Sequence, residues 1–198
     1  MPHPRYPRLV ATREEVEVKI AVPDLPALTR RLTRVGFAIS TSRIFEQNIV
    51  LDDPDGSIKA SNRLLRVRQA GDLITVTYKG REIDGIHKRR EEREFHANNL
   101  DECLAVFAGI GLRPAYRYEK YRTEFARDGQ PGHAVVDETP IGVYMELEGP
   151  PEWIDQAARD LGFSPVDYIL LSYMRLYAAW CEARGLAQKD MLFGIESA

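Results

Sequence analysis

Charged and apolar residues alternate near the start of this 198-residue chain. In the segment 14–22, Glu15, Glu17 and Lys19 share one face, and valine and isoleucine occupy the other. Two glutamates two residues apart on a strand direct their carboxylates to the same side, where the oxygens suit a hard divalent cation such as Mg²⁺ or Mn²⁺. The segment therefore predicts a β-strand with an ionic face that can take part in metal binding.

The same alternation recurs along the chain and predicts one ionic surface built from several strands. Its candidate residues are eight acids and eight bases: Glu15, Glu17, Lys19, Arg66, Arg68, Lys79, Lys88, Arg90, Glu92, Glu94, Lys120, Arg122, Glu124, Asp137, Glu146 and Glu148. Arginine binds phosphate oxygens through paired donors, and lysine adds a compact charge. Carboxylates in the same cavity would repel a polyanion unless a divalent cation lay between them. Acids and bases together therefore indicate a metal-bound phosphate chain.

Short alternating segments predict the strands that position these residues. They are 14–22, 43–51, 63–69, 73–79, 87–95, 116–125, 134–137 and 143–148. The turn residues 128–132 predict a hairpin between two of them. The segment 87–95 is polar on both faces, so periodicity alone does not decide which of its side chains point inward.

Four amphipathic segments predict helices that cover the apolar strand faces. Asp24 is the expected N-cap of a helix that stops at Gly36, and Asn99 caps another that ends at 109–111. Two more helices are expected at 152–161 and 165–184. These patterns predict a curved antiparallel sheet with helices outside and a charged, wet interior. A barrel for hydrophobic ligands would need an apolar interior, so that class is excluded.

The aromatic residues of the last helices are interpreted as packing residues. They are Trp153, Trp180, Tyr168, Tyr173 and Tyr177. The four histidines, His3, His87, His96 and His133, are scattered and expected at the surface or in turns. None of the motifs GxxxxGK, GxGxxG, HExxH or GxSxG is present, so no motif supports the corresponding nucleotide-binding, zinc-protease or hydrolase classes.

The composition limits which binding partners and which cellular compartment are expected for this protein. With 44% hydrophobic residues the chain should bury a core, and its 27 basic and 30 acidic residues leave a net charge of −3. This balance argues against a general nucleic-acid or membrane-surface binder. No apolar run is long enough to span a membrane, and residues 1–10 lack a signal peptide, so a cytoplasmic protein is expected. Cys103 and Cys181 are expected as reduced thiols in helices.

A series of motifs resembles the CYTH superfamily, also called triphosphate tunnel metalloenzymes. Glu15-Val16-Glu17-Val18-Lys19 matches the ExExK signature of that superfamily, which includes class IV adenylate cyclases, thiamine triphosphatases and inorganic triphosphatases. Further matching motifs follow in order between residues 14 and 177: Leu65-Arg66-Val67-Arg68, Thr77-Tyr78-Lys79-Gly80, Arg90-Glu91-Glu92-Arg93-Glu94, Glu119-Lys120-Tyr121-Arg122, Asp137-Glu138-Thr139-Pro140-Ile141-Gly142 and Glu146-Leu147-Glu148-Gly149.

The resemblance implies an α+β fold, an eight-stranded antiparallel β-barrel that forms a triphosphate tunnel, with amphipathic helices packed outside. A single CYTH domain is expected over residues 14–185, after an N-terminal extension at 1–13 and before a loose C-terminal tail at 186–198. The resemblance also implies that Lys88, Arg90, Glu92 and Glu94 point into the barrel. A weak internal echo, in which both Glu15-x-Glu17 and Glu92-x-Glu94 precede a helix and a strand, fits a sheet built from two similar halves.

The resemblance further implies roles for the inward residues. The triphosphate-binding positions are Lys19, Arg66, Arg68, Lys79, Lys88, Arg90, Lys120 and Arg122. The metal-binding positions are Glu15, Glu17, Glu92, Glu94, Asp137, Glu146 and Glu148, with Mg²⁺ or Mn²⁺ as cofactor. Lys19, Glu146 and Glu148 are the expected catalytic residues. Lys19 could activate a water molecule or bind phosphate, and the second role is favoured.

These features together favour a divalent-metal-dependent triphosphatase whose partner is tripolyphosphate, ATP or thiamine triphosphate. A class IV adenylate cyclase that converts ATP to cAMP and pyrophosphate is the alternative. A non-catalytic polyphosphate or nucleotide sensor is a third hypothesis, prompted by Leu171 where many relatives carry lysine before Ser172-Tyr173. No nucleic-acid or membrane partner is expected. The oligomeric state is left open, with a homodimer as one option.

Overall fold

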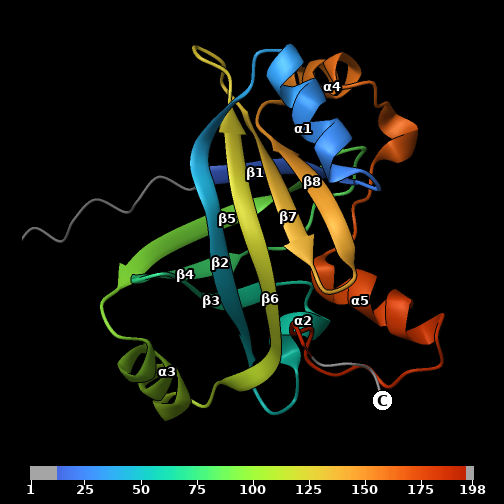
Figure 1. The fold of residues 1–198 in the computed structure, drawn as a ribbon. Helices are drawn as coiled ribbons and strands as arrows, with labels where there is room; N and C mark the ends of the chain where they lie inside the picture. The colour runs from blue at the N-terminus through green and yellow to red at the C-terminus, as the bar shows by residue number, and fades with distance from the viewer. Residues whose placement is uncertain (1–12, 195–198) are drawn as a thin grey trace, which may run out of the picture.

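A computed structural model describes residues 13–194 and shows a closed antiparallel barrel of eight strands (Figure 1). The strands are β1 (Arg13–Ala21), β2 (Ala38–Asp52), β3 (Leu64–Ala70), β4 (Leu73–Lys79), β5 (Lys88–Ala97), β6 (Arg113–Ala126), β7 (His133–Thr139) and β8 (Gly142–Glu148). Their order around the barrel is β1-β5-β4-β3-β2-β6-β7-β8. The eight-stranded fold predicted from the motifs is therefore confirmed, whereas the extension before residue 13 lies outside the described residues.

The strand order supports two similar halves. When each strand number is advanced by four, the order of strands around the barrel maps onto itself, so β1 pairs with β5 and β2 pairs with β6. In each half a helix connects the first strand to the second, which agrees with the internal echo in the sequence.

Over the described part of the chain, five α-helices lie outside the barrel: α1 (Leu25–Arg34), α2 (Ser57–Ala60), α3 (Leu100–Gly109), α4 (Pro151–Asp160) and α5 (Tyr173–Glu182). The expected N-caps are confirmed, because Asp24 accepts a hydrogen bond from the amide of Ala27 and Asn99 accepts one from the amide of Glu102. Helices α1 and α4 lie together at the top of Figure 1, where they pack against β1 and β8, and α5 lies at the lower right.

The prediction of one helix over 165–184 is wrong. A 3-10 turn, η1 (Pro165–Asp167), is closed by a capping box between Ser164 and Asp167, and α5 then begins after its own N-cap, Ser172. Between them the chain is extended, and Ile169 forms a bridge with Lys19 on β1. Helical periodicity did not reveal this break, since the pairing partner lies far away in sequence.

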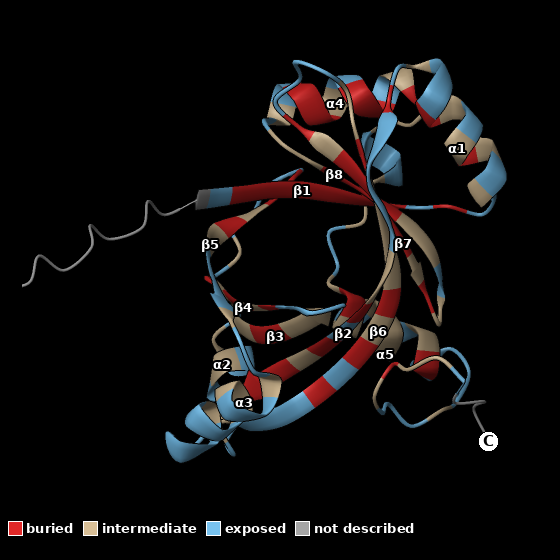
Figure 2. Cartoon of the chain, turned by 60° about the vertical axis from the view of Figure 1, so that its left-hand side comes forward, coloured by how far each residue is buried: buried red, intermediate tan, exposed pale blue. Residues whose placement is uncertain are grey.

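Most of the hydrophobic core lies between the barrel and its helices, and a smaller cluster with Val50, Tyr116 and Tyr118 borders the barrel interior. Leu28 of α1 and Ile154 of α4 pack with Val18, Met145 and Leu147 from the outer faces of β1 and β8. A second cluster packs α3 against β3 and β4. Figure 2 shows most of β1 as buried, because its apolar side chains meet this core and its charged ones face inward. The ionic face predicted from alternation is thus enclosed by the barrel.

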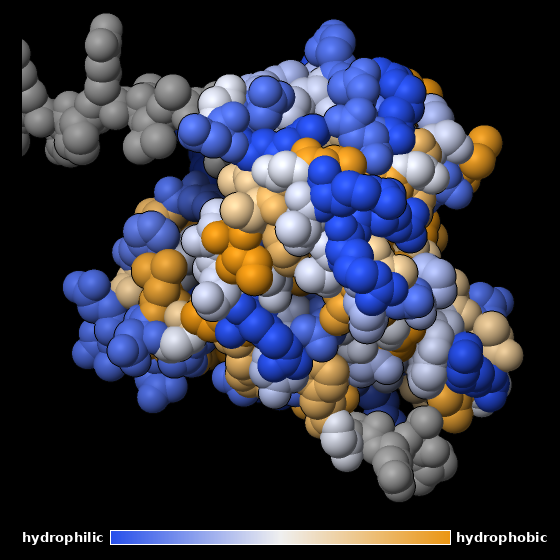
Figure 3. Space-filling view, turned by 45° about the horizontal axis from the view of Figure 1, so that its top comes forward, coloured by the Kyte–Doolittle hydropathy of each residue, from blue (hydrophilic) through white to orange (hydrophobic). Residues whose placement is uncertain are grey.

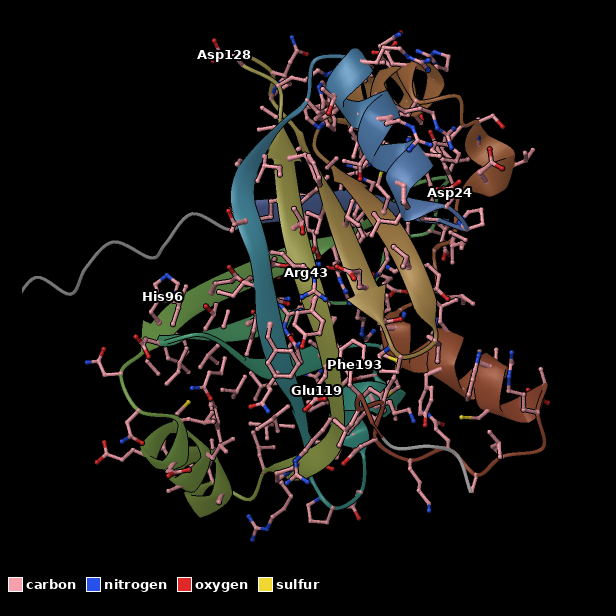
Figure 4. The ribbon with its side chains drawn as sticks, viewed as in Figure 1. Asp24, Arg43, His96, Glu119, Asp128 and Phe193 are labelled. Carbon is pink, nitrogen blue, oxygen red and sulfur yellow. The ribbon has the colours of Figure 1, made fainter. Side chains whose placement is uncertain are left out.

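The expectation of a loose tail does not hold for residues 190–193. Strand β7 pairs with β6 only over Tyr121–Ala126, so the first half of β6 has a free edge. Met191 fills it: its amide donates to the carbonyl of Arg117, its carbonyl accepts from Glu119, and its side chain is buried. Beside it, Phe193 lies against Glu119 (Figure 4), and the Phe193 amide donates to the Glu119 carboxylate at 3.0 Å.

On the face seen in Figure 3, hydrophobic side chains are scattered among hydrophilic ones. Among residues 13–194, no helix is both long and apolar enough to cross a membrane. Cys103 on α3 and Cys181 on α5 are both free thiols, as predicted.

Candidate active site in the barrel

The barrel encloses a cavity of about 190 Å³, here called the barrel cavity, to which α5 also contributes. Every residue of the predicted ionic surface lines it except Asp137, which lies directly behind Lys120 and Arg122. The expected triphosphate-binding residues and the expected glutamate ligands are therefore brought together. Their placement is confirmed, and their roles remain predictions.

Strand register explains how distant acids and bases meet. Glu17 on β1 lies opposite Glu148 on β8 and opposite Lys88 on β5. The next inward position on β1 is Lys19, which lies opposite Glu146. Because side chains alternate along a strand, one register fixes every inward contact of β1.

The cationic wall is formed mainly by β3 and β6. Arg66 donates to the Thr77 hydroxyl at 3.1 Å, and Arg68 donates to the Asn48 side-chain oxygen at 3.0 Å. Strand β6, which β2 separates from β3, adds Lys120 and Arg122. These donors line one cavity, as binding of several phosphate groups requires.

Glu46 on β2 also belongs to this wall, although it was not among the candidate ionic residues identified from the sequence. Its carboxylate lies 3.3 Å from Arg68 Nη1 and 3.5 Å from Lys120 Nζ. Burial opposes ionisation of Glu46, but the charges of Lys120, Arg122 and Arg68 outweigh it and lower its pKa to about 2. The signal was weak, because Glu46 and Asn48 share one face of the predicted strand 43–51 but the polar residue Gln47 between them obscures the alternation.

The opposite wall is rich in carboxylates, each paired with a cation. Glu17 accepts from Lys88 at 2.5 Å, and Lys79 pairs with Glu15 and with Glu92, the latter at 2.7 Å. Although burial opposes ionisation of Glu17, the Lys88 charge holds its pKa well below the ordinary range. Glu17 is therefore charged at neutral pH and available to a cation.

Asp137 is fully buried and binds neighbouring donors. Its Oδ1 accepts from Arg122 Nε at 2.7 Å. Its Oδ2 accepts from Arg122 Nη2 at 2.6 Å, from Lys120 Nζ at 2.7 Å and from the Tyr173 hydroxyl at 2.8 Å. This geometry supports a positioning role for Asp137 in the cationic wall and gives no support to the expected metal-ligand role.

Tyr173 does more than pack a helix, so the interpretation from sequence was incomplete. The Tyr173 hydroxyl donates a hydrogen bond to Asp137. The Tyr173 ring lies 4.4 Å from Lys19 Nζ, and the residue lines the barrel cavity. By contrast, Trp153 packs in the core against Phe37, as predicted. Leu171, which is 40% exposed, does not line the cavity.

The histidines were expected at the surface or in turns, and two of them are more enclosed than that expectation suggests. His87 is only 6% exposed, and its Nε2 lies 2.8 Å from Asp155 Oδ1 on α4. His133 lines the cavity and lies 3.5 Å from Glu148. His96 is exposed on β5, as expected (Figure 4), and His3 lies outside the described residues. A lone histidine in a turn gave no sequence signal of its distant partner.

The carboxylate wall has the donor chemistry of a divalent-cation site. Glu17, Glu146 and Glu148 lie on adjoining strands and present hard oxygens, which Mg²⁺ and Mn²⁺ prefer. Glu17 and Glu146 repel each other, and this repulsion acts to raise the pKa of Glu17. Within residues 13–194, no three acidic, histidine or cysteine side chains are grouped closely enough to form a metal site. Lysine and arginine side chains instead donate hydrogen bonds to Glu17 and Glu146. The donor set nevertheless fits a cation that would relieve this repulsion.

Comparisons with known proteins agree with this architecture. A Methanocaldococcus jannaschii protein named "Putative adenylate cyclase" is 27% identical over 134 residues, which cover 68% of this chain and 75% of that protein. A Vibrio parahaemolyticus structure, described as a putative adenylate cyclase, shares the fold with a TM-score of 0.74 and 17% identity, over 84% of this chain and 98% of the other.

A Hippeastrum structure, described as a putative adenylyl cyclase with a dominant triphosphatase activity, superposes with a TM-score of 0.63 and 14% identity. The match covers 88% of this chain and 97% of that one. The family model of the CYTH domain matches residues 13–173, which include all eight strands of the barrel. This chain therefore belongs to the CYTH family.

Proposed function

We propose that this protein is a divalent-metal-dependent phosphohydrolase that acts on triphosphates bound in the barrel cavity. Candidate substrates are inorganic tripolyphosphate and the triphosphates of nucleosides or thiamine. One observation carries the proposal: cations on β3 and β6 and carboxylates on β1 and β8 line the same enclosed cavity. A cavity lined by cations alone could bind the phosphates but not the metal, and one lined by carboxylates alone could bind the metal but not the phosphates.

The proposed chemistry depends on positioning and charge neutralisation, since phosphoryl transfer needs little covalent help from a protein. Phosphate oxygens would be bound by Arg66, Arg68, Lys79, Lys88, Arg90, Lys120 and Arg122. Glu17, Glu146 and Glu148 would hold the cation, with Glu15, Glu92 and Glu94 as further candidates. A bound divalent cation supplies positive charge to the phosphate oxygens.

Lys19 is better suited to binding phosphate than to activating water. Burial opposes its charge, but Glu146 and Glu17 outweigh burial and raise the pKa of Lys19 above its ordinary value. A lysine that stays protonated can bind an anion and cannot accept a proton from water. Lys19 therefore complements the cationic wall from the opposite side of the cavity.

Adenylate cyclase activity is the second candidate. The named M. jannaschii relative favours it, whereas the activity described for the Hippeastrum protein favours triphosphatase. In the cyclase reaction the ribose 3′ oxygen attacks the α-phosphorus of ATP and releases pyrophosphate. A non-catalytic sensor has less support, because Leu171 lies outside the cavity lining and the cationic side chains on β3 and β6 are all retained.

Product analysis separates these functions. The purified protein is incubated with ATP or tripolyphosphate and with Mg²⁺ or Mn²⁺, and orthophosphate, pyrophosphate and cAMP are then separated. Orthophosphate from either substrate supports the proposal, and cAMP with pyrophosphate supports the cyclase. Binding without turnover would identify a sensor. Absence of binding to both substrates would contradict the proposed site.

A further inference from the structure

Tyr118 lies in the cationic wall, and the motifs do not assign it a role. It precedes Lys120 by two residues on β6, lines the barrel cavity and is 7% exposed. Its hydroxyl oxygen accepts a hydrogen bond from Arg66 Nη1 at 3.4 Å. Because successive inward residues on a strand lie roughly 7 Å apart, a phosphate chain along β6 could reach both Lys120 and Tyr118.

The surroundings of Tyr118 are unusually cationic for a phenol. The titratable and charged groups around its side chain come from β3, β6 and α5, and they are Arg66, Arg68, Tyr116, Lys120 and Tyr173. Glu46 on β2 lies beyond them and pairs with Arg68 and Lys120. Burial opposes ionisation of the phenol, but Arg66, Lys120 and Arg68 outweigh burial and lower its pKa to about 8.

The two neighbouring tyrosines behave differently. The Tyr116 ring stacks on the Tyr118 ring with centroids 5.9 Å apart, yet burial raises the pKa of Tyr116. Burial and the charge of Asp137 likewise raise the pKa of Tyr173, whose hydroxyl already donates to Asp137. Among these three residues, Tyr118 alone combines a place in the cationic wall with a hydroxyl proton that is lost in mildly alkaline solution.

We propose that the Tyr118 hydroxyl donates a hydrogen bond to an oxygen of the bound triphosphate, and that its ionised form excludes this anion. The inference rests on the proposed function, because it needs triphosphate in the barrel cavity. The proton stays on Tyr118 in the complex, and no covalent bond changes. Ionisation removes the donor and adds a negative charge beside Arg66, so phenolate and triphosphate compete for the same cations.

The experiment measures tripolyphosphate binding by calorimetry, from neutral to alkaline pH, for the wild type, Tyr118→Phe and Tyr116→Phe. At neutral pH, Tyr118→Phe should bind about tenfold more weakly, because it lacks a hydrogen bond to a charged group. Wild-type affinity should fall about tenfold per pH unit above the pKa of Tyr118, since the binding-competent fraction falls in that ratio. Tyr116→Phe is the matched control and should retain this fall.

Lysines also affect the alkaline range, so the comparison between variants decides the outcome. Burial lowers the pKa of Lys88 and Lys120, and their loss of charge should weaken binding in all three proteins. Tyr118→Phe should therefore keep a shallower fall that begins at higher pH. Equal pH dependence in Tyr118→Phe and the wild type would overturn the inference while leaving the proposed function intact. No tripolyphosphate binding at any pH would instead overturn the proposed function.

A spectroscopic titration tests the inference even if Tyr118→Phe folds poorly. Tyrosinate absorbance in the near ultraviolet should rise with an apparent pKa of about 8 in the wild type. Tripolyphosphate should move that transition to higher pH, because the anion favours the protonated phenol. A transition that tripolyphosphate does not move would contradict contact between Tyr118 and the anion.

Discussion

Lys19 Nζ donates to Glu146 Oε1 at 2.7 Å, although the two residues lie 127 positions apart in the sequence. Both side chains are buried, and the pair joins β1 to β8 inside the barrel. Glu146 also accepts from Arg122 Nη2 at 2.8 Å, so it connects the carboxylate wall to the cationic wall. An anionic substrate and a divalent cation would each compete for one member of this network.

The first prediction concerns the proposed metal ligands. The double variant Glu146→Gln, Glu148→Gln should lose metal-dependent turnover by at least about 100-fold, because neutral amides provide no charge to hold the cation. The fold should persist, since an amide oxygen can still accept from Lys19 and Arg122. Turnover and circular dichroism are measured together.

The control for that variant is Glu138→Gln, which alters a carboxylate on β7 that pairs with exposed Arg43 outside the cavity. Its turnover should match the wild type. Equal metal dependence in the double variant and in this control would show that Glu146 and Glu148 do not bind the metal.

The second prediction tests Asp137 as a positioning residue. Asp137→Asn should destabilise the fold by about 3 kcal/mol, because Lys120 and Arg122 would lose a buried counter-charge. Glu138→Gln, next to it on β7, should change stability by less than about 1 kcal/mol. Urea unfolding gives both values. A large loss of metal affinity in Asp137→Asn without loss of stability would restore the metal-ligand role.

The third prediction concerns stability in acid. The pKa of Glu46 is lowered from 4.5 to about 2, so ionised Glu46 stabilises the fold fully above pH 4.5. That contribution, about 3 kcal/mol, should be lost as the pH falls from 4.5 toward 2. Comparing unfolding curves of the wild type and Glu46→Gln should show a shallower acid dependence in the variant. Parallel dependence in both proteins would contradict the assigned charge of Glu46.

The fourth prediction concerns the buried histidine. Replacing His87 by alanine should cost about 1 to 3 kcal/mol, because Asp155 would lose a buried hydrogen-bond partner. His96→Ala, at an exposed position on β5, should change stability by less than about 0.5 kcal/mol. Thermal melting compares the two. Equal melting temperatures would show that the contact between His87 and Asp155 adds nothing.

Much of the fold and most of the site were predictable because the relevant signals are local. Period-two alternation identified the strands, and it placed Glu15, Glu17 and Lys19 on one face. Enclosure of that face was inferred from the number of such strands and from the amphipathic helices available to cover their apolar faces, since alternation in one strand does not distinguish a solvent-exposed face from a cavity. Register then brought together side chains whose separation in sequence hides their contact.

The residues that sequence reasoning missed depend on partners far along the chain. Tyr118 acquires its properties from Arg66 on another strand, and His87 is buried by a helix that contains Asp155. Tyr173 was interpreted as a packing residue because an aromatic residue at helical spacing indicates a core. Its hydroxyl reaches Asp137 from the start of α5, which follows an extended segment bridged to Lys19 through Ile169.

A crystal structure of the protein with tripolyphosphate and Mn²⁺ would show directly whether the barrel cavity binds both. Tripolyphosphate density should lie inside the barrel against Arg66, Lys120 and Arg122. An anomalous manganese peak should lie beside Glu17, Glu146 and Glu148. Tripolyphosphate and manganese bound only on the outer surface, with the barrel cavity holding neither, would show that this cavity is not the binding site.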